Sequence, residues 1–127
     1  MSEIVSMSMS NELLGKLNSA EKGLGFSGRS ETLRAAINLL VDEHKQRALL
    51  KGRIDAVMLI IHDDVPEEIS KIRHRHNHSI KTQIHNHLSS GKCLELFIVS
   101  DKAGEIKKMA NDFERNKKIE FAKLVVP

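Results

Sequence analysis

Three side chains that can bind a transition metal lie close together in one short stretch of the sequence. His85 and His87 are two residues apart, and the one cysteine of the chain, Cys93, follows six residues later. Residues two apart in a β-strand point to the same face, so both imidazoles can reach one ion. Two imidazoles and a thiolate suit Ni(II), Cu(II), Co(II) or Zn(II), and they are poor ligands for Mg²⁺ or Ca²⁺. The spacing therefore predicts a transition-metal site.

The expected strand pairing brings the thiol to the histidines. Two segments of strand character flank the turn residues Ser89-Ser90-Gly91, which indicates a β-hairpin. If the loop covers residues 88–92, His87 stands opposite Cys93 and the thiolate shares the face of the imidazoles. The sequence allows other registers as well.

The residues alone do not fix a fourth ligand. A lone cysteine is most often a small core residue, and a pair of strand histidines is most often a solvated polar face. Their conjunction with three more histidines just upstream favours the metal site; these candidates are His74, His76 and His78. The other two histidines, His44 and His62, are expected to be surface or structural residues.

Apolar periodicity predicts the elements that position these side chains. The expected order is a strand at Ile54–Ile61, a helix starting in the acidic, proline-containing stretch 63–68 and ending near Arg75, strands at Ser79–Leu88 and Cys93–Val99, a helix at about Ala103–Asn116, and a strand at Lys118–Val126. This β-α-β-β-α-β order predicts a ferredoxin-like domain over residues 54–127 in an α+β chain.

The N-terminal residues predict a different kind of module. Ile4–Ser10 alternates apolar and polar residues like a strand, with Val5, Met7 and Met9 facing inward. Two amphipathic helices are expected to follow, one capped by Ser10 and ending near Gly25, and one from Ser27 or Gly28 toward Ala48. A lone strand with two helices cannot close a core, so residues 1–50 are expected to form an obligate dimer.

Some of these N-terminal residues are suited to contacts with DNA. The outward Ser6 and Ser8 could bond base edges in a major groove, and the helix start at Ser27–Glu31 could hold a phosphate. The alternative for Ser6 and Ser8 is a polar strand face without a DNA contact. The alternative for the helix start is an ordinary cap, with Glu31 as its carboxylate. Net charge does not distinguish DNA binding from these alternatives, because residues 1–50 hold six basic and six acidic side chains.

Composition sets further bounds. The chain has 127 residues, 40% hydrophobic and 29% charged, which is typical of a globular protein. Aromatic residues make up only 3%, which disfavours stacking on single-stranded nucleic acid. One cysteine, with no leader and no long apolar run, predicts a cytoplasmic protein without a membrane contact.

On these residues the sequence resembles the nickel-responsive repressors of the ribbon-helix-helix superfamily over nearly its whole length. The resemblance rests on the strand Val5–Met9, the pair Leu13-Leu14, the stretch Gly25–Glu31 and, most specifically, the pattern His74-x10-His85-x-His87-x5-Cys93-Leu94-Glu95.

The resemblance implies a fold, a cofactor and partners. It implies a square-planar Ni(II) held by His85, His87 and Cys93 of one subunit and His74 of a neighbour. It implies interleaved ribbon-helix-helix dimers at the ends of a tetrameric core of ACT-like domains, hence a dimer of dimers that binds double-stranded operator DNA. The DNA contacts carried over by position are those of Ile4, Ser6 and Ser8 to bases and of Ser27, Arg29 and Ser30 to phosphates.

The sequence departs from the family pattern at three places. Ile4 stands where the better-known members have a base-reading arginine, so the preferred operator should differ. Gly28 replaces a usual asparagine cap. The segment between His62 and His74 is slightly shorter than expected, so His76 or His78 could replace His74 as the fourth ligand.

The expected function is a metal-responsive transcriptional repressor or regulator rather than an enzyme. One alternative is a ribbon-helix-helix regulator that senses Co(II), Cu(II), Zn(II) or a small molecule. A metal enzyme, with His62, Asp63 or Asp64 as a base, is less favoured, because the expected site has enough ligands to be closed. A metal-storage or chaperone protein is also less favoured, and it would be distinguished by its failure to bind duplex DNA.

Overall fold

The computed structural model describes residues 2–64 and 66–127. It divides into two compact units, one ending at Ala48 and the other running from Leu49 to Pro127. Val65, within the stretch where a helix start was expected, lies outside the described residues. Among the described residues, no helix combines the length and the apolar character needed to cross a membrane.

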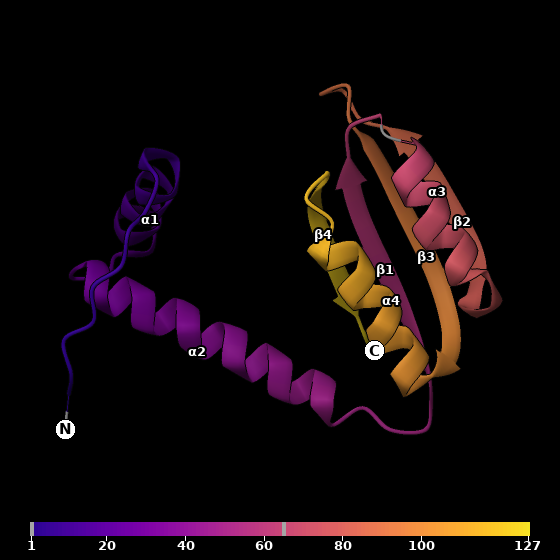
Figure 1. Ribbon diagram of the computed structural model, residues 1–127, viewed down its shortest axis with the longest axis horizontal. Coiled ribbons are helices and arrows are strands. Elements are labelled where there is room, and N and C mark those ends of the chain that lie inside the picture. Colours follow the sequence, from indigo (N-terminus) through magenta and orange to yellow (C-terminus); the bar gives the residue numbers. More distant parts are fainter. Residues whose placement is uncertain (1, 65) are drawn as a thin grey trace. The chain divides into compact units, whose positions relative to one another are not determined.

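The first unit contains two helices, α1 (Asn11–Leu24) and α2 (Arg29–Ala48) (Figure 1). The Ser10 hydroxyl accepts a hydrogen bond of 3.1 Å from the Leu13 amide, which caps α1. Gly25 ends α1 in the left-handed conformation with φ of 72°, which a glycine adopts without steric cost. The expected cap at Ser10 and the expected end near Gly25 are both confirmed.

A local carboxylate closes the turn between the two helices. The Ser27 amide and hydroxyl both donate to the Glu31 carboxylate, at 2.6 and 2.5 Å. These hydrogen bonds from Ser27 hold the pKa of Glu31 below its usual range. The interpretation of Glu31 as a capping carboxylate is confirmed. The Ser27 hydroxyl, expected to be available to a phosphate, already donates to this carboxylate.

The strand expected over Ile4–Ser10 is not formed in the single chain. Residues 2–10 have no regular secondary structure, and the side chains of Val5 and Met7 are 84% and 69% exposed. The expectation that they face inward is therefore wrong for one copy of the chain. The physical reason is that strand backbone groups need a neighbouring strand as hydrogen-bond partner, and a single copy does not provide one at this position.

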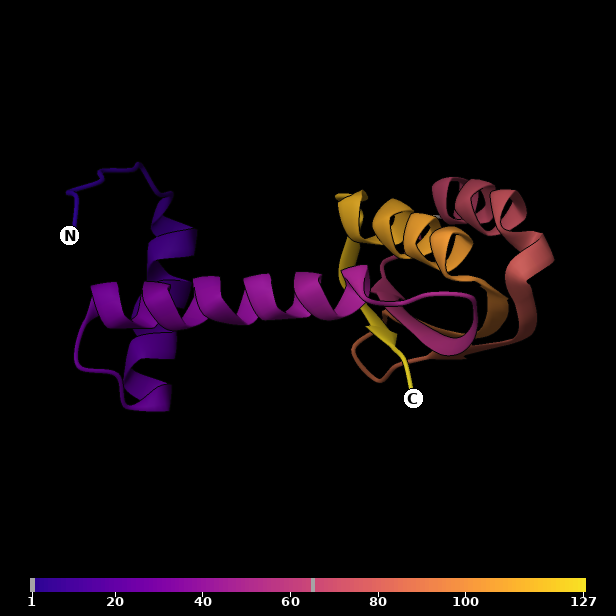
Figure 2. The same cartoon turned by 90° about the horizontal axis from the view of Figure 1, so that it is seen from below.

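The second unit is built on a four-stranded antiparallel sheet. Its elements are β1 (Arg53–His62), α3 (Pro66–Arg75), a 3₁₀ turn (Asn77–Ser79), β2 (Ile80–His87), β3 (Cys93–Lys102), α4 (Ala103–Arg115) and β4 (Ile119–Val125). The strand order is β2-β3-β1-β4. Figure 2 shows α3 and α4 on the same side of the sheet. The predicted β-α-β-β-α-β order is confirmed, and the chain is α+β.

The core lies between the helices and this face of the sheet. Alternate residues of β1 and β3 are buried there, and Phe97 of β3 stacks on Phe113 of α4 with ring centroids 5.5 Å apart. Burial of each such side chain contributes about 1.5–3 kcal/mol. The residues of the core are Ala56, Met58, Ile60, Ile69, Ile72, Phe97, Val99, Ile106, Met109, Ala110 and Phe113.

A polar contact joins the end of α3 to α4. The buried His76 places Nε2 2.6 Å from the Asp112 carboxylate, and Arg75 donates to the same carboxylate at 2.9 Å. Partial burial acts to raise the pKa of Asp112, but the hydrogen bonds from His76 and Arg75 outweigh it, so the pKa lies below its usual value. The ionised carboxylate therefore stabilises the fold.

Replacing this carboxylate should lower stability in a pH-dependent way. We expect Asp112→Asn to lower the free energy of unfolding near neutral pH by about 1–3 kcal/mol, because buried His76 loses its charged partner. A carboxyl with a lowered folded-state pKa stabilises above its unfolded pKa of about 3.9, and this contribution is lost as pH falls through the folded-state value. Urea unfolding of wild type and variant should therefore converge in acid, whereas the exposed Asp55→Asn control should match wild type throughout. A difference that stays constant with pH would contradict this account.

Candidate metal centre

The strand register places three potential donors in one row across the sheet. His87 of β2 pairs with Cys93 of β3, which in turn pairs with His62 of β1. Directly paired residues point to the same face, so these side chains lie on the helix-covered side. In the next row Glu95 pairs with His85. The predicted pairing of His87 with Cys93 is confirmed.

A tight loop holds this register. The Leu88 amide donates to the Lys92 carbonyl at 2.8 Å, and the Gly91 amide donates to the Leu88 carbonyl at 2.9 Å. Gly91 has φ of 87°, a conformation that side chains with a Cβ rarely adopt. Lys92 also pairs with Glu120 of β4. The loop thus covers residues 88–92 as expected.

The structure brings three of the four predicted ligands together. Donor atoms of His85, His87 and Cys93 all lie within 4.8 Å of one another. The Cys93 Sγ is 3.6 Å from His87 Nδ1, and the two imidazole centroids are 5.2 Å apart. Donors bound to one ion at about 2.0–2.3 Å lie no more than roughly 4.5 Å apart, so small rotations of the exposed imidazoles complete the geometry. The residues therefore fit a transition-metal ion.

The surroundings of the thiol favour a cation. Cys93 is only 2% exposed, and burial raises the pKa of its thiol. The negative charges of Asp64, Glu95 and Asp63 raise this pKa further. Without a metal the thiol therefore keeps its proton near neutral pH. A bound cation reverses this balance, because it stabilises the thiolate directly.

A buried carboxylate, part of the motif but without a predicted role, lies beside the donor set. Glu95 is 2% exposed and accepts hydrogen bonds from His62 Nε2 at 2.7 Å and Gln83 Nε2 at 2.8 Å. Arg73 of α3 donates to it at 3.4 Å, and His85 Nδ1 is 4.0 Å away. Glu95 thus joins β1, β2 and α3 next to the site. A carboxylate behind a ligating imidazole orients the ring and raises its basicity.

His62 belongs to this network and not to the donor group. Its Nδ1 lies 2.5 Å from the Asp63 carbonyl oxygen, and its Nε2 lies 2.7 Å from Glu95. Both ring nitrogens face acceptors, so neither presents a lone pair to a metal in this arrangement. His62 is a buried structural residue. This confirms one of the two alternatives expected for His62, a surface or a structural residue. Its contact with Glu95 depends on the register of β1 against β3, which the sequence did not specify.

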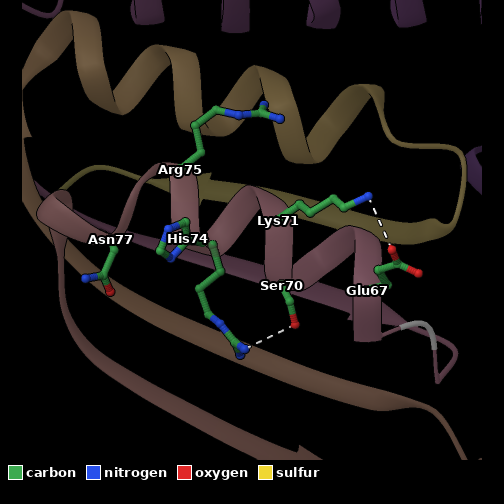
Figure 3. Close-up of a pocket in the computed structure, with 7 residues that line it drawn as sticks. Glu67, Ser70, Lys71, His74, Arg75 and Asn77 are labelled. Carbon is green, nitrogen blue, oxygen red and sulfur yellow. Dashed lines mark hydrogen bonds and ion pairs between the residues drawn. The ribbon is translucent and has the colours of Figure 1, made fainter.

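The three upstream histidines have different environments. His74 is exposed on α3, in a hollow that it lines with Ser70, Arg75 and Asn77 (Figure 3). It is not among the donors that the structure gathers around Cys93. His76 is buried against Asp112, and His78 faces the carboxylates of Asp101 and Glu105 at 3.4 and 3.5 Å. Of the three, His74 is the one on the outer side of α3 and without a carboxylate partner in the described residues.

The residues predicted to contact DNA lie in the first unit. Ile4, Ser6 and Ser8 are exposed in the segment before α1. Arg29 and Ser30 are exposed at the start of α2, where Arg29 Nε donates to Asn18 Oδ1 at 3.3 Å. The structure thus leaves these five side chains at the surface of one copy.

Glu95 offers a test of the buried network. We expect Glu95→Ala to lower the free energy of unfolding of the metal-free protein by about 3–5 kcal/mol, because it leaves the buried His62 without its partner. The control is Glu120→Ala, which removes an exposed carboxylate from the same sheet and should cost less than about 1 kcal/mol. Chemical denaturation followed by circular dichroism measures both. Equal effects of the two substitutions would show that the network adds little to stability.

Comparison with known proteins identifies relatives of this arrangement. Residues 55–126 match the family model described as the NikR C terminal nickel binding domain. The "Putative nickel-responsive regulator" of Methanococcus maripaludis (strain S2) is 31% identical over 126 residues, covering 96% of this chain and 89% of the relative. The "Putative nickel-responsive regulator 3" of Methanosarcina acetivorans is 28% identical over 124 residues, covering 94% and 89%.

A solved structure supports the fold alone. An uncharacterised protein from Thermotoga maritima superposes with a TM-score of 0.55 at 9% identity, over 59% of this chain and 98% of its own. At this identity the likeness concerns architecture and not chemistry.

Proposed function

The chain belongs to the family of nickel-responsive regulators, and from that premise we propose that it is a transcriptional regulator whose binding to double-stranded operator DNA depends on bound Ni(II). Ni(II) is the ion of the family domain, and residues 55–126 that match it include the whole His/Cys group. The observation that carries the proposal is the convergence of His85, His87 and Cys93 on one face of a hairpin. Membership in a regulator family favours a protein that is not an enzyme.

We propose four ligands for the ion. His85, His87 and Cys93 would come from one subunit, and the exposed His74 would come from a neighbouring one. The burial of His76 and the carboxylate contacts of His78 support this choice of the fourth ligand. Bound here, Ni(II) supplies a positive charge that holds the thiolate and links two subunits. Co(II), Cu(II) and Zn(II) are the alternatives that the same donors admit.

Exposed apolar surfaces support a dimer of dimers. On α2, Ile37, Leu40 and Val41 are 58%, 68% and 42% exposed and recur at helical spacing. The sheet face that α3 and α4 leave open carries four more, Ile84, Ile98, Phe121 and Val125, each 42–47% exposed. Two separate apolar surfaces fit two kinds of contact between copies, one through residues 1–50 and one through the ACT-like domain of residues 54–127.

The first unit supports the proposal of a ribbon-helix-helix module. A second copy would supply the strand that Ile4–Ser10 lacks, so two such segments would pair as an antiparallel ribbon. Ser6, Ser8 and Ile4 would then face base edges in a major groove. Arg29 and Ser30 would lie at a phosphate-binding helix start, with Ser27 closing the turn behind them.

The contacts of Glu95 suggest how metal binding could affect the position of α3. Arg73 precedes the proposed ligand His74, and its guanidinium bonds Glu95 between the donor strands. An ion bound by both subunits would favour the arrangement in which α3 of one copy meets the hairpin of another. It can shift that equilibrium only by the difference in its affinity for the two arrangements, typically about 1–3 kcal/mol.

Single substitutions test the ligand set. Cys93→Ala and His85→Ala should each abolish stoichiometric Ni(II) binding, the thiolate absorption band and the release of about one thiol proton on binding. His74→Ala should retain three donors and bind more weakly, with an altered spectrum. His44→Ala on α2 is the matched control and should behave as wild type. Unchanged stoichiometry in both Cys93→Ala and His85→Ala would place the metal elsewhere.

Selection of binding sites from a randomised duplex library tests the regulatory function. With Ni(II) the full chain should enrich a two-fold symmetric sequence, and the affinity for it should fall by roughly 5–150-fold when the metal is removed. Ser6→Ala with Ser8→Ala should reduce enrichment while leaving nickel binding unchanged. Equal affinity with and without Ni(II) would remove the metal switch, and no enrichment under either condition would remove DNA recognition.

A further inference from the structure

Four cationic side chains of the second unit line one hollow, at the place where the chain enters β1 and leaves β3. They are Lys51, Arg53, Lys102 and Lys107, and we call the feature the basic hollow. Its volume is about 540 Å³, and its other lining residues are uncharged. The nickel donors lie at the opposite end of β3, since Cys93 begins that strand and Lys102 ends it. The basic hollow is therefore separate from the metal centre.

The backbone holds these cations together. Arg53 and Lys102 are direct partners in the β1–β3 ladder, and like charges opposite each other are destabilising. The Ala103 amide donates to the Gly52 carbonyl at 2.8 Å, and Lys107 Nζ donates to the Leu50 carbonyl at 3.2 Å. The fold thus fixes a cluster whose mutual repulsion opposes folding. An anionic partner would relieve that repulsion.

One adjoining acid balances only part of the charge of the cluster. Asp101 adjoins it, and hydrogen bonds from Ser79 and from the Lys102 amide lower the pKa of its carboxyl, with smaller contributions from His78 and Arg53. Its two oxygens accept hydrogen bonds, one from the Ser79 hydroxyl at 2.6 Å and one from the Lys102 amide at 2.7 Å. Within the described residues, the lysine side chains of the hollow form no ion pair with it.

The position of the hollow along the chain points to the nature of the anion. Lys51 is the third residue after Ala48, the last residue of the first unit. Three residues of extended chain span at most about 10 Å, so Lys51 is tethered within that distance of Ala48 at the end of α2. Residues 45–53 contain four cations and no acid, namely Lys45, Arg47, Lys51 and Arg53. The hollow thus continues a basic stretch of the chain that begins in α2, and such a run of cations matches the repeated charges of a polyanion.

We propose that the basic hollow binds backbone phosphates of the same DNA duplex, beside the stretch that the first unit contacts. This inference rests on the proposed function and adds a second, sequence-independent contact to it. Phosphate contacts of this kind strengthen binding and fix orientation without reading bases. They also anchor the metal-binding unit to the DNA.

The salt dependence of DNA binding tests this inference. The variant Lys51→Gln/Arg53→Gln/Lys102→Gln leaves Lys107 and its bond to Leu50 in place. In the nickel-loaded full chain, the slope of log K against log salt should become shallower by about 2–3, because roughly one counterion is released for each phosphate contact. The loss should be the same on the selected operator and on a mixed-sequence duplex of about four helical turns. Nickel stoichiometry should stay at the wild-type value, and the unfolding temperature should be equal to or higher than that of wild type, because the substitutions relieve the repulsion among the cations.

A matched variant controls for net charge. Lys81→Gln/Lys117→Gln/Lys118→Gln removes the same charge from exposed positions of the same unit and should keep the wild-type slope. Equal slopes for the two triple variants would overturn the inference and leave the proposed function intact. If wild type binds no duplex at any salt concentration, the inference and the proposed function both fail. If inorganic phosphate binds wild type but not the first triple variant, and duplex binding is unchanged, the hollow is a small-anion site and the DNA inference is wrong.

Discussion

The antiparallel register of β1, β3 and β2 is the constraint on which the metal centre depends. Side chains alternate between the two faces of a sheet, so a slip of one residue would carry the Cys93 thiol to the opposite face. The same alternation buries Phe97 and Val99 of β3 beneath the helices. The hydrophobic effect that closes the core therefore also determines which face carries the donors, and no separate interaction is needed to choose it.

Along β3 the buried face changes from apolar to polar. Phe97 packs in the core, Glu95 takes three hydrogen bonds, and Cys93 meets the histidines at the end of the sheet. Glu95 stays buried because each neighbouring element contributes a donor to it, and an unpaired carboxylate in this position would oppose folding. The helix α3 is consequently tied through Arg73 to the strand that begins with Cys93, and not only by apolar packing.

Much of the second unit could be predicted from the sequence, because its patterns are local. The turn at residues 88–92 and the alternation around it indicated the pairing of His87 with Cys93 among several possible registers, and the structure has that pairing. The His62–Glu95 contact could not be predicted, because it depends on the register between β1 and β3, two strands far apart in the chain. The N-terminal strand was expected from its alternation, but the described residues of a single copy provide no strand as its hydrogen-bond partner. In the proposed site, the position of His74 relative to the other donors would likewise depend on a second copy.

The conformation of Gly91 affects the alignment of the two strands that carry the candidate metal donors. Its φ of 87° is strained for any residue with a Cβ, although there is open space around it. A substitution at Gly91 would weaken the turn that aligns the hairpin while leaving every donor atom in the sequence. A search of the sequence for the histidines and the cysteine alone would then still identify such a chain as a candidate metal-responsive regulator. Screening homologues for function should therefore include this glycine, which contributes no candidate donor atom but whose conformation aligns the hairpin that carries His87 and Cys93.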